Sequence, residues 1–190
     1  MSRVRVKLAV GVAVIGVAAT TAAAVAGGGA KLRTSLTGYE EVAAISTPGV
    51  GSFKARISRS ADEISYELRY AELETDATQA HIHFEQRTNN GPIVVFLCSN
   101  LANGPAGTQA CPAEGGTVTG TIKPADVSAS AASAGAVTAG LGVGEFDEFV
   151  SALRAGATYV NVHSDGRPGG EIRGQIGGKE HRDGDDHDGH

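Results

Sequence analysis

Three histidines in two short segments of the chain have the residue type and spacing of metal ligands. His81 and His83 are separated by one residue, and His163 ends a second segment at 159–163. Alternate residues of a β-strand point to the same side, so His81 and His83 should project from one face. Neutral imidazole nitrogens are good ligands for copper and zinc. The pattern therefore indicates a copper or zinc site at His81, His83 and His163.

A second interpretation of these histidines needs no metal. Glu85 continues the face that carries His83, and Glu171 lies in the segment that follows His163. The histidines would then form hydrogen bonds with Glu85, Glu171 and the backbone, and so hold neighbouring strands together. In the metal interpretation, Glu171 or Asp165 would instead be an oxygen ligand or would orient a histidine. The residue types alone leave both interpretations open.

The segments at 159–163 and 171–176 each have one polar and one aliphatic face. The Gly/Pro-rich residues 164–170 between them predict a hairpin. If this hairpin pairs His163 with Glu171, the polar residues of both segments face one another across the strands. The sequence then predicts a polar stripe that is the best candidate binding site, made of His81, His83, His163, Glu171, Arg173 and Asn161.

Other chemistry-bearing patterns are missing from the sequence. There is no nucleophile beside a general base, no phosphate-binding glycine loop and no carboxylate pair of the glycosidase kind. We therefore expect a protein that is not an enzyme. The last residues, 179–190, hold His181, His187 and His190 among acidic residues. We expect this tail to be disordered, with weak binding of divalent ions as the alternative.

An alternation of period two dominates the rest of the chain. Ile64, Tyr66, Leu68 and Tyr70 alternate with polar residues, which is the pattern of a half-buried strand. Similar patterns predict eight strands in all, near 32–38, 53–58, 62–71, 79–85, 92–98, 116–122, 158–163 and 170–177. We therefore expect an all-β, antiparallel fold of the β-sandwich or barrel type.

One short helix is expected among the strands. In residues 145–155, Phe146, Phe149, Val150 and Leu153 recur at helical spacing, and acidic residues crowd the first turns. Gly156 stands where a helix would end. The Ala/Ser/Gly-rich residues 127–144 before it have no clear period, and we expect a weak strand or a long loop there.

The two ends of the chain bear on where it works. Residues 1–26 combine three basic residues, an aliphatic run and the small residues Ala24-Val25-Ala26, which is the pattern of a cleaved secretory signal peptide. We expect no later segment to span a membrane. In an exported chain, the two cysteines, Cys98 and Cys111, are expected to form a disulfide that closes a Gly/Pro/Asn-rich loop.

Charge limits the possible partners. The formal net charge is −5, and loss of the three basic residues of the signal peptide would bring it to −8. We expect no basic patch, and so no binding to nucleic acid. The expected partner is an extracellular protein or a surface component.

Several segments, taken in order, resemble the chordin-type (CHRD) domain, which occurs as a single domain in many microbial secreted proteins. The resemblance covers about 32–177 and rests on the segments LTGYEEV at 36–42, AHIHF at 80–84, NGPIVVFL at 90–97, GATYVNVHSD at 156–165 and PGGEIRGQI at 168–176. The chain departs from the family pattern by its Ala/Ser-rich insertion at 127–140 and its Cys98–Cys111 loop.

The resemblance implies an immunoglobulin-like β-sandwich and no established catalytic activity. Together with the residue patterns, it predicts a secreted, non-enzymatic binding or structural module with one domain at 32–177 and a tail at 178–190. The alternative is a redox or metal-handling protein that uses the three histidines.

Overall fold

The computed structural model describes residues 29–177, so the expected signal peptide at 1–26 and the tail at 178–190 lie outside the described residues. Eight strands form within this range, as the alternation predicts. They are β1 (Lys31–Thr37), β2 (Val50–Ile57), β3 (Ile64–Ala71), β4 (Ala77–Phe84), β5 (Ile93–Ser99), β6 (Gly116–Ile122), β7 (Thr158–Ser164) and β8 (Arg167–Ile176).

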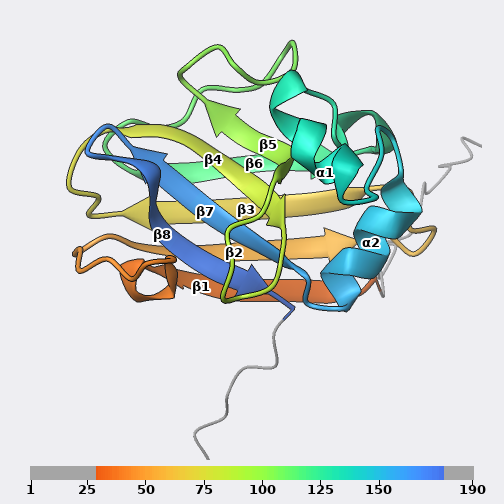
Figure 1. The fold of residues 1–190 in the computed structure, drawn as a ribbon, viewed down its shortest axis with the longest axis horizontal. Helices are drawn as coiled ribbons and strands as arrows, with labels where there is room; N and C mark the ends of the chain where they lie inside the picture. The colour runs from red at the N-terminus through yellow and green to blue at the C-terminus, as the bar shows by residue number, and fades with distance from the viewer. Residues whose placement is uncertain (1–28, 178–190) are drawn as a thin grey trace, which may run out of the picture.

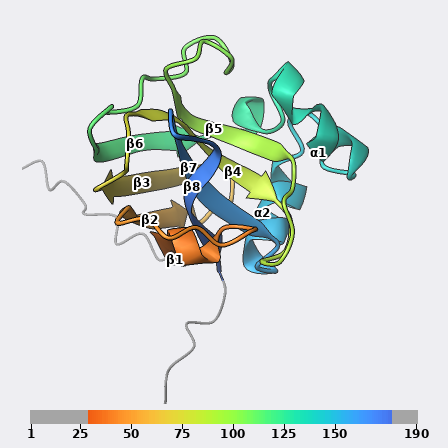
Figure 2. The same ribbon diagram turned by 60° about the vertical axis from the view of Figure 1, so that its left-hand side comes forward.

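The eight strands form one antiparallel sheet in the order β5-β4-β7-β8-β1-β2-β3-β6. The sheet curls until its two edge strands, β5 and β6, lie beside each other, so the molecule is nearly barrel-shaped (Figures 1 and 2). The all-β antiparallel class is therefore confirmed. The strands form a single curled sheet, whereas an immunoglobulin-like sandwich would divide them between two sheets. Alternation along a strand defines its buried face but does not determine its neighbours.

The inward faces of the strands form one hydrophobic core. Phe53, Leu68, Ile82, Val160 and Ile172 are each 1% exposed or less and come from five different strands. In β3 the burial alternates strictly, with Ile64, Tyr66, Leu68 and Tyr70 inside. β4, β7 and β8 differ, because most of their residues are buried on both faces. The polar face of these three strands is thus covered by other parts of the chain.

The helices add a smaller layer at one end of the sheet (Figure 1). Helix α2 (Phe146–Arg154) forms where the sequence predicts it and buries Phe146, Phe149, Val150 and Leu153. A second helix, α1 (Ala134–Thr138), and a 3-10 turn at Ala131–Ser133 form within residues 127–144, where a weak strand or long loop was expected. Alanine, the strongest helix former, is abundant in this stretch. No described helix has both the length and the apolar character needed to cross a bilayer.

The disulfide between Cys98 and Cys111 is present, as expected. Cys98 lies near the end of β5 and is fully buried, and Cys111 is 5% exposed. The bridge closes a loop over residues 99–110 that returns the chain to the edge of the sheet before β6 begins.

Candidate metal site on the covered polar face

The pairing of β4 with β7 brings the three histidines together. In this ladder Gln79 lies opposite His163 and His81 opposite Asn161. The ligand atoms of His81, His83 and His163 all lie within 4.8 Å of one another. Their exposed fractions are 0%, 7% and 6%. The structure therefore groups the three histidines that the sequence marks as metal ligands into one buried cluster.

Backbone carbonyls orient two of the three rings. Nδ1 of His83 lies 2.8 Å from the carbonyl oxygen of Gly91, and Nδ1 of His163 lies 2.9 Å from that of Pro168. A carbonyl oxygen can only accept, so each of these Nδ1 atoms carries the proton and donates. The Nε2 atom of both rings is then a lone-pair nitrogen. Metal-binding histidines are commonly held in this way, with the second ring nitrogen donating to a carbonyl.

The lone pairs inside the cluster outnumber the protons available to them. Nδ1 of His81 lies 3.2 Å from Nε2 of His163, so this pair can share one proton. Oδ1 of Asn161, also an acceptor, lies 3.1 Å from the same Nε2 atom. The Nε2 atoms of His81 and His83 are buried without a hydrogen-bond partner. Buried acceptors without donors are costly, and a bound cation would satisfy them.

Burial keeps the imidazoles in the neutral form that binds metals. Desolvation, reinforced by the neighbouring histidines, lowers the pKa of His81 to about 2. Desolvation is also the main cause that lowers the pKa of His83 to about 4, although its hydrogen bond to Gly91 acts in the opposite direction. The pKa of His163 is lowered for the same reason. At neutral pH the three rings therefore carry no charge and do not repel a cation.

The loop at 85–92 covers the polar face, and Arg173 of β8 holds it there. The guanidinium of Arg173 donates to the carbonyl oxygens of Gln86, Arg87 and Asn89 and to Oδ1 of Asn90. It also lies 3.4 Å from the centre of the Tyr159 ring, which stacks on His83. These oxygen acceptors and the face of the Tyr159 ring thus stabilise the positive charge of Arg173 beside the cluster.

Glu41 is a buried acidic neighbour that the sequence patterns do not single out. Its carboxylate is 7% exposed, and its Oε1 atom has no hydrogen-bond partner. Desolvation raises the pKa of Glu41 to about 7, although the charge of Arg173 and a hydrogen bond with Asn161 oppose this. A Cβ atom at Gly170 would lie 2.5 Å from Oε1 of Glu41, so only glycine leaves room for the carboxylate there. Glu41 lies in a loop without periodicity, which gives no sequence signal.

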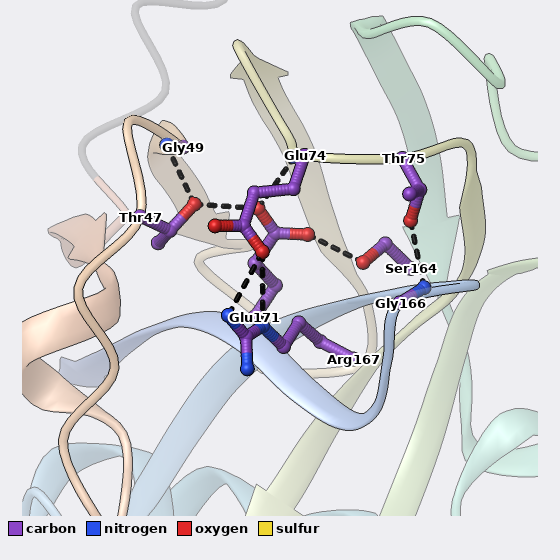
Figure 3. Close-up of polar contacts among 8 residues, drawn as sticks. All are labelled: Thr47, Gly49, Glu74, Thr75, Ser164, Gly166, Arg167 and Glu171. Atoms are coloured by element: carbon purple, nitrogen blue, oxygen red, sulfur yellow. Dashed lines mark hydrogen bonds and ion pairs between the residues drawn. The ribbon is translucent and has the colours of Figure 1, made fainter.

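Glu171 is not part of the histidine cluster. Its Oε1 atom accepts from the Thr47 hydroxyl at 2.6 Å and from the Glu74 amide at 2.8 Å, and Oε2 accepts from the Ser164 hydroxyl (Figure 3). The β7–β8 ladder is irregular between Val162 and Ser164, so the expected pairing of His163 with Glu171 does not form. The fully buried Glu171 instead ties three chain segments together at one end of the sheet.

The other predicted members of the polar stripe have mixed outcomes. Asn161 lies opposite Arg173 in the β7–β8 ladder, as expected. Asp165 is exposed and lies outside the cluster. The Glu85 carboxylate bonds to the amide of Gln86 rather than to a histidine. The hydrogen-bonding interpretation thus holds for the backbone partners of the histidines but not for the proposed carboxylate partners.

Comparison with known proteins gives the family of the chain. No curated protein and no solved structure matches the sequence. The CHRD domain matches residues 32–176, which is most of the chain and includes all three histidines and nearly all of the described sheet. This confirms the resemblance found in the sequence. The chain therefore belongs to the CHRD domain family.

Proposed function

We propose that this CHRD domain is an exported, non-enzymatic binding module that holds one copper or zinc ion between His81, His83 and His163. The observation that carries the proposal is the excess of buried lone pairs in the cluster. The Nε2 atoms of His81 and His83 have no partner, and Nε2 of His163 faces an amide oxygen and Nδ1 of His81, with which it can share only one proton. A transition-metal ion bound by one nitrogen of each ring would take up one lone pair from each of the three histidines.

The spacing of the nitrogens supports this ligand class. Two imidazole nitrogens that share a tetrahedral zinc ion, each about 2.0 Å from the metal, lie about 3.3 Å apart. Nδ1 of His81 and Nε2 of His163 are 3.2 Å apart. The carbonyl bonds at Nδ1 of His83 and His163 leave the Nε2 atoms of these rings free to face a metal.

Burial supports a binding role over a catalytic one. A catalytic zinc or copper site keeps an open coordination position for water or substrate. Here the three histidines are at most 7% exposed, and the loop at 85–92 lies over the face that carries them. The Cys98–Cys111 disulfide is consistent with work outside the cytoplasm, because such bonds persist in oxidising compartments.

Metal titration of the full exported chain tests the proposal. Isothermal titration calorimetry with Zn²⁺, and separately with Cu²⁺, should give one tight site per chain. The His163→Ala variant should bind at least 100-fold more weakly. A triple variant, His181→Ala/His187→Ala/His190→Ala, is the matched control and should keep the tight site, since it removes three imidazoles from the tail only.

A second measurement guards against a variant that fails to fold. Zn²⁺ should raise the melting temperature of the wild-type chain, because a ligand that binds only the folded state stabilises it. It should leave the melting temperature of His163→Ala unchanged. Equal binding by His163→Ala and wild type, or loss of the site only in the tail variant, would overturn the proposal.

A further inference from the structure

The outer face of β1 and β2 carries four cationic side chains side by side. Lys31 and Arg33 of β1 lie directly opposite Arg56 and Lys54 of β2 in the antiparallel ladder. All four residues are exposed. The expectation of no basic patch is therefore wrong, because the two pairs belong to separate segments and only the pairing of the strands joins them. We call these four residues the basic patch.

This arrangement works against the stability of the sheet. Like charges directly opposite each other on neighbouring strands repel. Glu67 lies beside the patch, but it is shared between Lys54 at 3.8 Å and Arg69 at 3.0 Å. Within the part of the chain that the structure describes, neither Lys31 nor Arg33 forms an ion pair. A local arrangement that opposes the fold is a sign of a role outside folding.

A shallow cleft of about 490 Å³ overlies the basic patch. Its lining adds the exposed hydroxyl residues Ser65 and Thr119 to the four cations, with Glu67 as the single acidic residue. Alternate residues along a strand are about 7 Å apart, and opposite residues about 5 Å apart. The cleft thus presents regularly spaced positive charges together with hydroxyl groups, which suits a ligand with repeated negative charges and hydroxyls of its own.

The aromatic content of the cleft decides against nucleic acid. Single-stranded nucleic acids bind through aromatic side chains that stack on the bases. Tyr66 is the only aromatic residue in the lining, and it is 9% exposed, with its hydroxyl donating to the carbonyl oxygen of Leu97.

We propose that the basic patch binds an acidic polysaccharide, a polymer of sugar rings that carry sulfate or carboxylate groups. Its anionic groups contact Lys31, Arg33, Lys54 and Arg56, and its hydroxyls contact Ser65 and Thr119. This surface lies on β1–β3 and β6, away from the histidines of β4 and β7, so it is independent of metal binding.

Binding of the full exported chain to fluorescein-labelled dextran sulfate, followed by fluorescence anisotropy at low salt, tests the proposal. The wild-type chain should bind dextran sulfate and polygalacturonate but not neutral dextran. Binding should weaken at least tenfold between 20 and 200 mM NaCl, as expected for a patch of several charges. The Lys31→Gln/Arg33→Gln variant should bind at least tenfold more weakly than wild type.

A matched control separates the patch from overall charge. The Lys123→Gln/Arg154→Gln variant removes the same charge from exposed positions on other elements and should bind like wild type. The patch variant should melt at the same temperature as wild type or higher, because it removes like-charge repulsion. Equal loss in both variants, binding of neutral dextran, or tighter binding of single-stranded DNA than of dextran sulfate would overturn the proposal.

Discussion

At the scale of single residues, burial determines the charge of the groups on the covered polar face. The histidines lose their charge because a cation is poorly solvated there, and their pKa values fall. The pKa of Glu41 rises for the same reason. Both effects destabilise the fold, but they do so at opposite ends of the pH range. The histidines destabilise the fold as the pH drops below their ordinary pKa of 6.5, and Glu41 destabilises it as the pH rises above 4.5.

Replacing Glu41 by glutamine should stabilise the protein at high pH. With a pKa of about 7 in the folded state against 4.5 when unfolded, Glu41 binds its proton more tightly in the fold. Its contribution to stability is therefore present below pH 4.5 and is lost as the pH rises through 7. The Glu41→Gln variant mimics the protonated form. Its free energy of unfolding should exceed that of wild type by about 1–3 kcal/mol at pH 8 and match it near pH 4.

Urea unfolding at pH 4 and pH 8, followed by circular dichroism, measures this difference. Glu40→Gln is the matched control, because Glu40 is the neighbouring acid but pairs with Arg87 at the surface, at 2.7 Å. Such pairs contribute at most about 1 kcal/mol, so this variant should show no gain at pH 8. A gain for Glu41→Gln that is equal at both pH values would contradict the assigned burial of the charge.

At the scale of elements, the loop at 85–92 completes the candidate site and depends on β8. Gly91 takes part in two contacts, since its carbonyl oxygen orients His83 and its amide donates to the hydroxyl of Tyr159 at 3.1 Å. Arg173 supplies four hydrogen bonds to the same loop. The position of one histidine ring is thus coupled to a guanidinium two strands away.

The Arg173→Lys variant should loosen this loop while the charge is kept. An ammonium group cannot reproduce the planar, multiple contacts of a guanidinium. We expect amide hydrogen exchange at 86–91 to quicken at least tenfold and the free energy of unfolding to fall by about 2–4 kcal/mol. Hydrogen exchange followed by mass spectrometry measures the first effect. Arg69→Lys, at an exposed position on β3, should change neither quantity, and faster exchange spread evenly over the sheet would argue against a specific clamp.

Elements were largely predictable from the sequence, but their neighbours were not. The alternation at Ile64, Tyr66 and Leu68 is a local property, so strand positions and faces follow from it. That β4 lies beside β7 depends on contacts between distant segments, and it alone decides whether His81 meets His163. Glu171, by contrast, is kept away from His163. A single irregularity in the β7–β8 ladder gives Glu171 different partners from those that simple pairing predicts.

At the scale of the whole molecule, the edge strands β5 and β6 meet along a line that we call the seam. Side chains and the disulfide loop close the curled sheet there. Among the described strands, no ladder pairs β5 with β6. Gln109, in the loop that the disulfide closes, donates from Nε2 to the carbonyl oxygens of Leu97 on β5 and Thr119 on β6. Cys98 and Cys111 anchor both ends of this loop. The disulfide thus holds the group that spans the seam.

Removing the bridge should weaken the whole fold without changing its class. The Cys98→Ser/Cys111→Ser variant should lose about 3 kcal/mol of unfolding free energy, the amount expected for a closed loop of this length. Chemical denaturation with and without a reducing agent measures the loss. The wild-type chain under reduction should match the double variant, and the variant itself should not respond to reduction. An unchanged stability in the variant would show that the loop holds its place without the bridge.

The seam has a further consequence for contacts between two copies of the protein. Uncovered strand edges are templates on which a second chain can add a strand, and this is a common start of aggregation. Here the Gln109 amide occupies the Leu97 and Thr119 carbonyls that such a strand would use. The loop thus acts as a cap against edge-to-edge polymerisation, and its protection depends on the redox state of the surroundings, because the bridge that holds the cap is itself reducible.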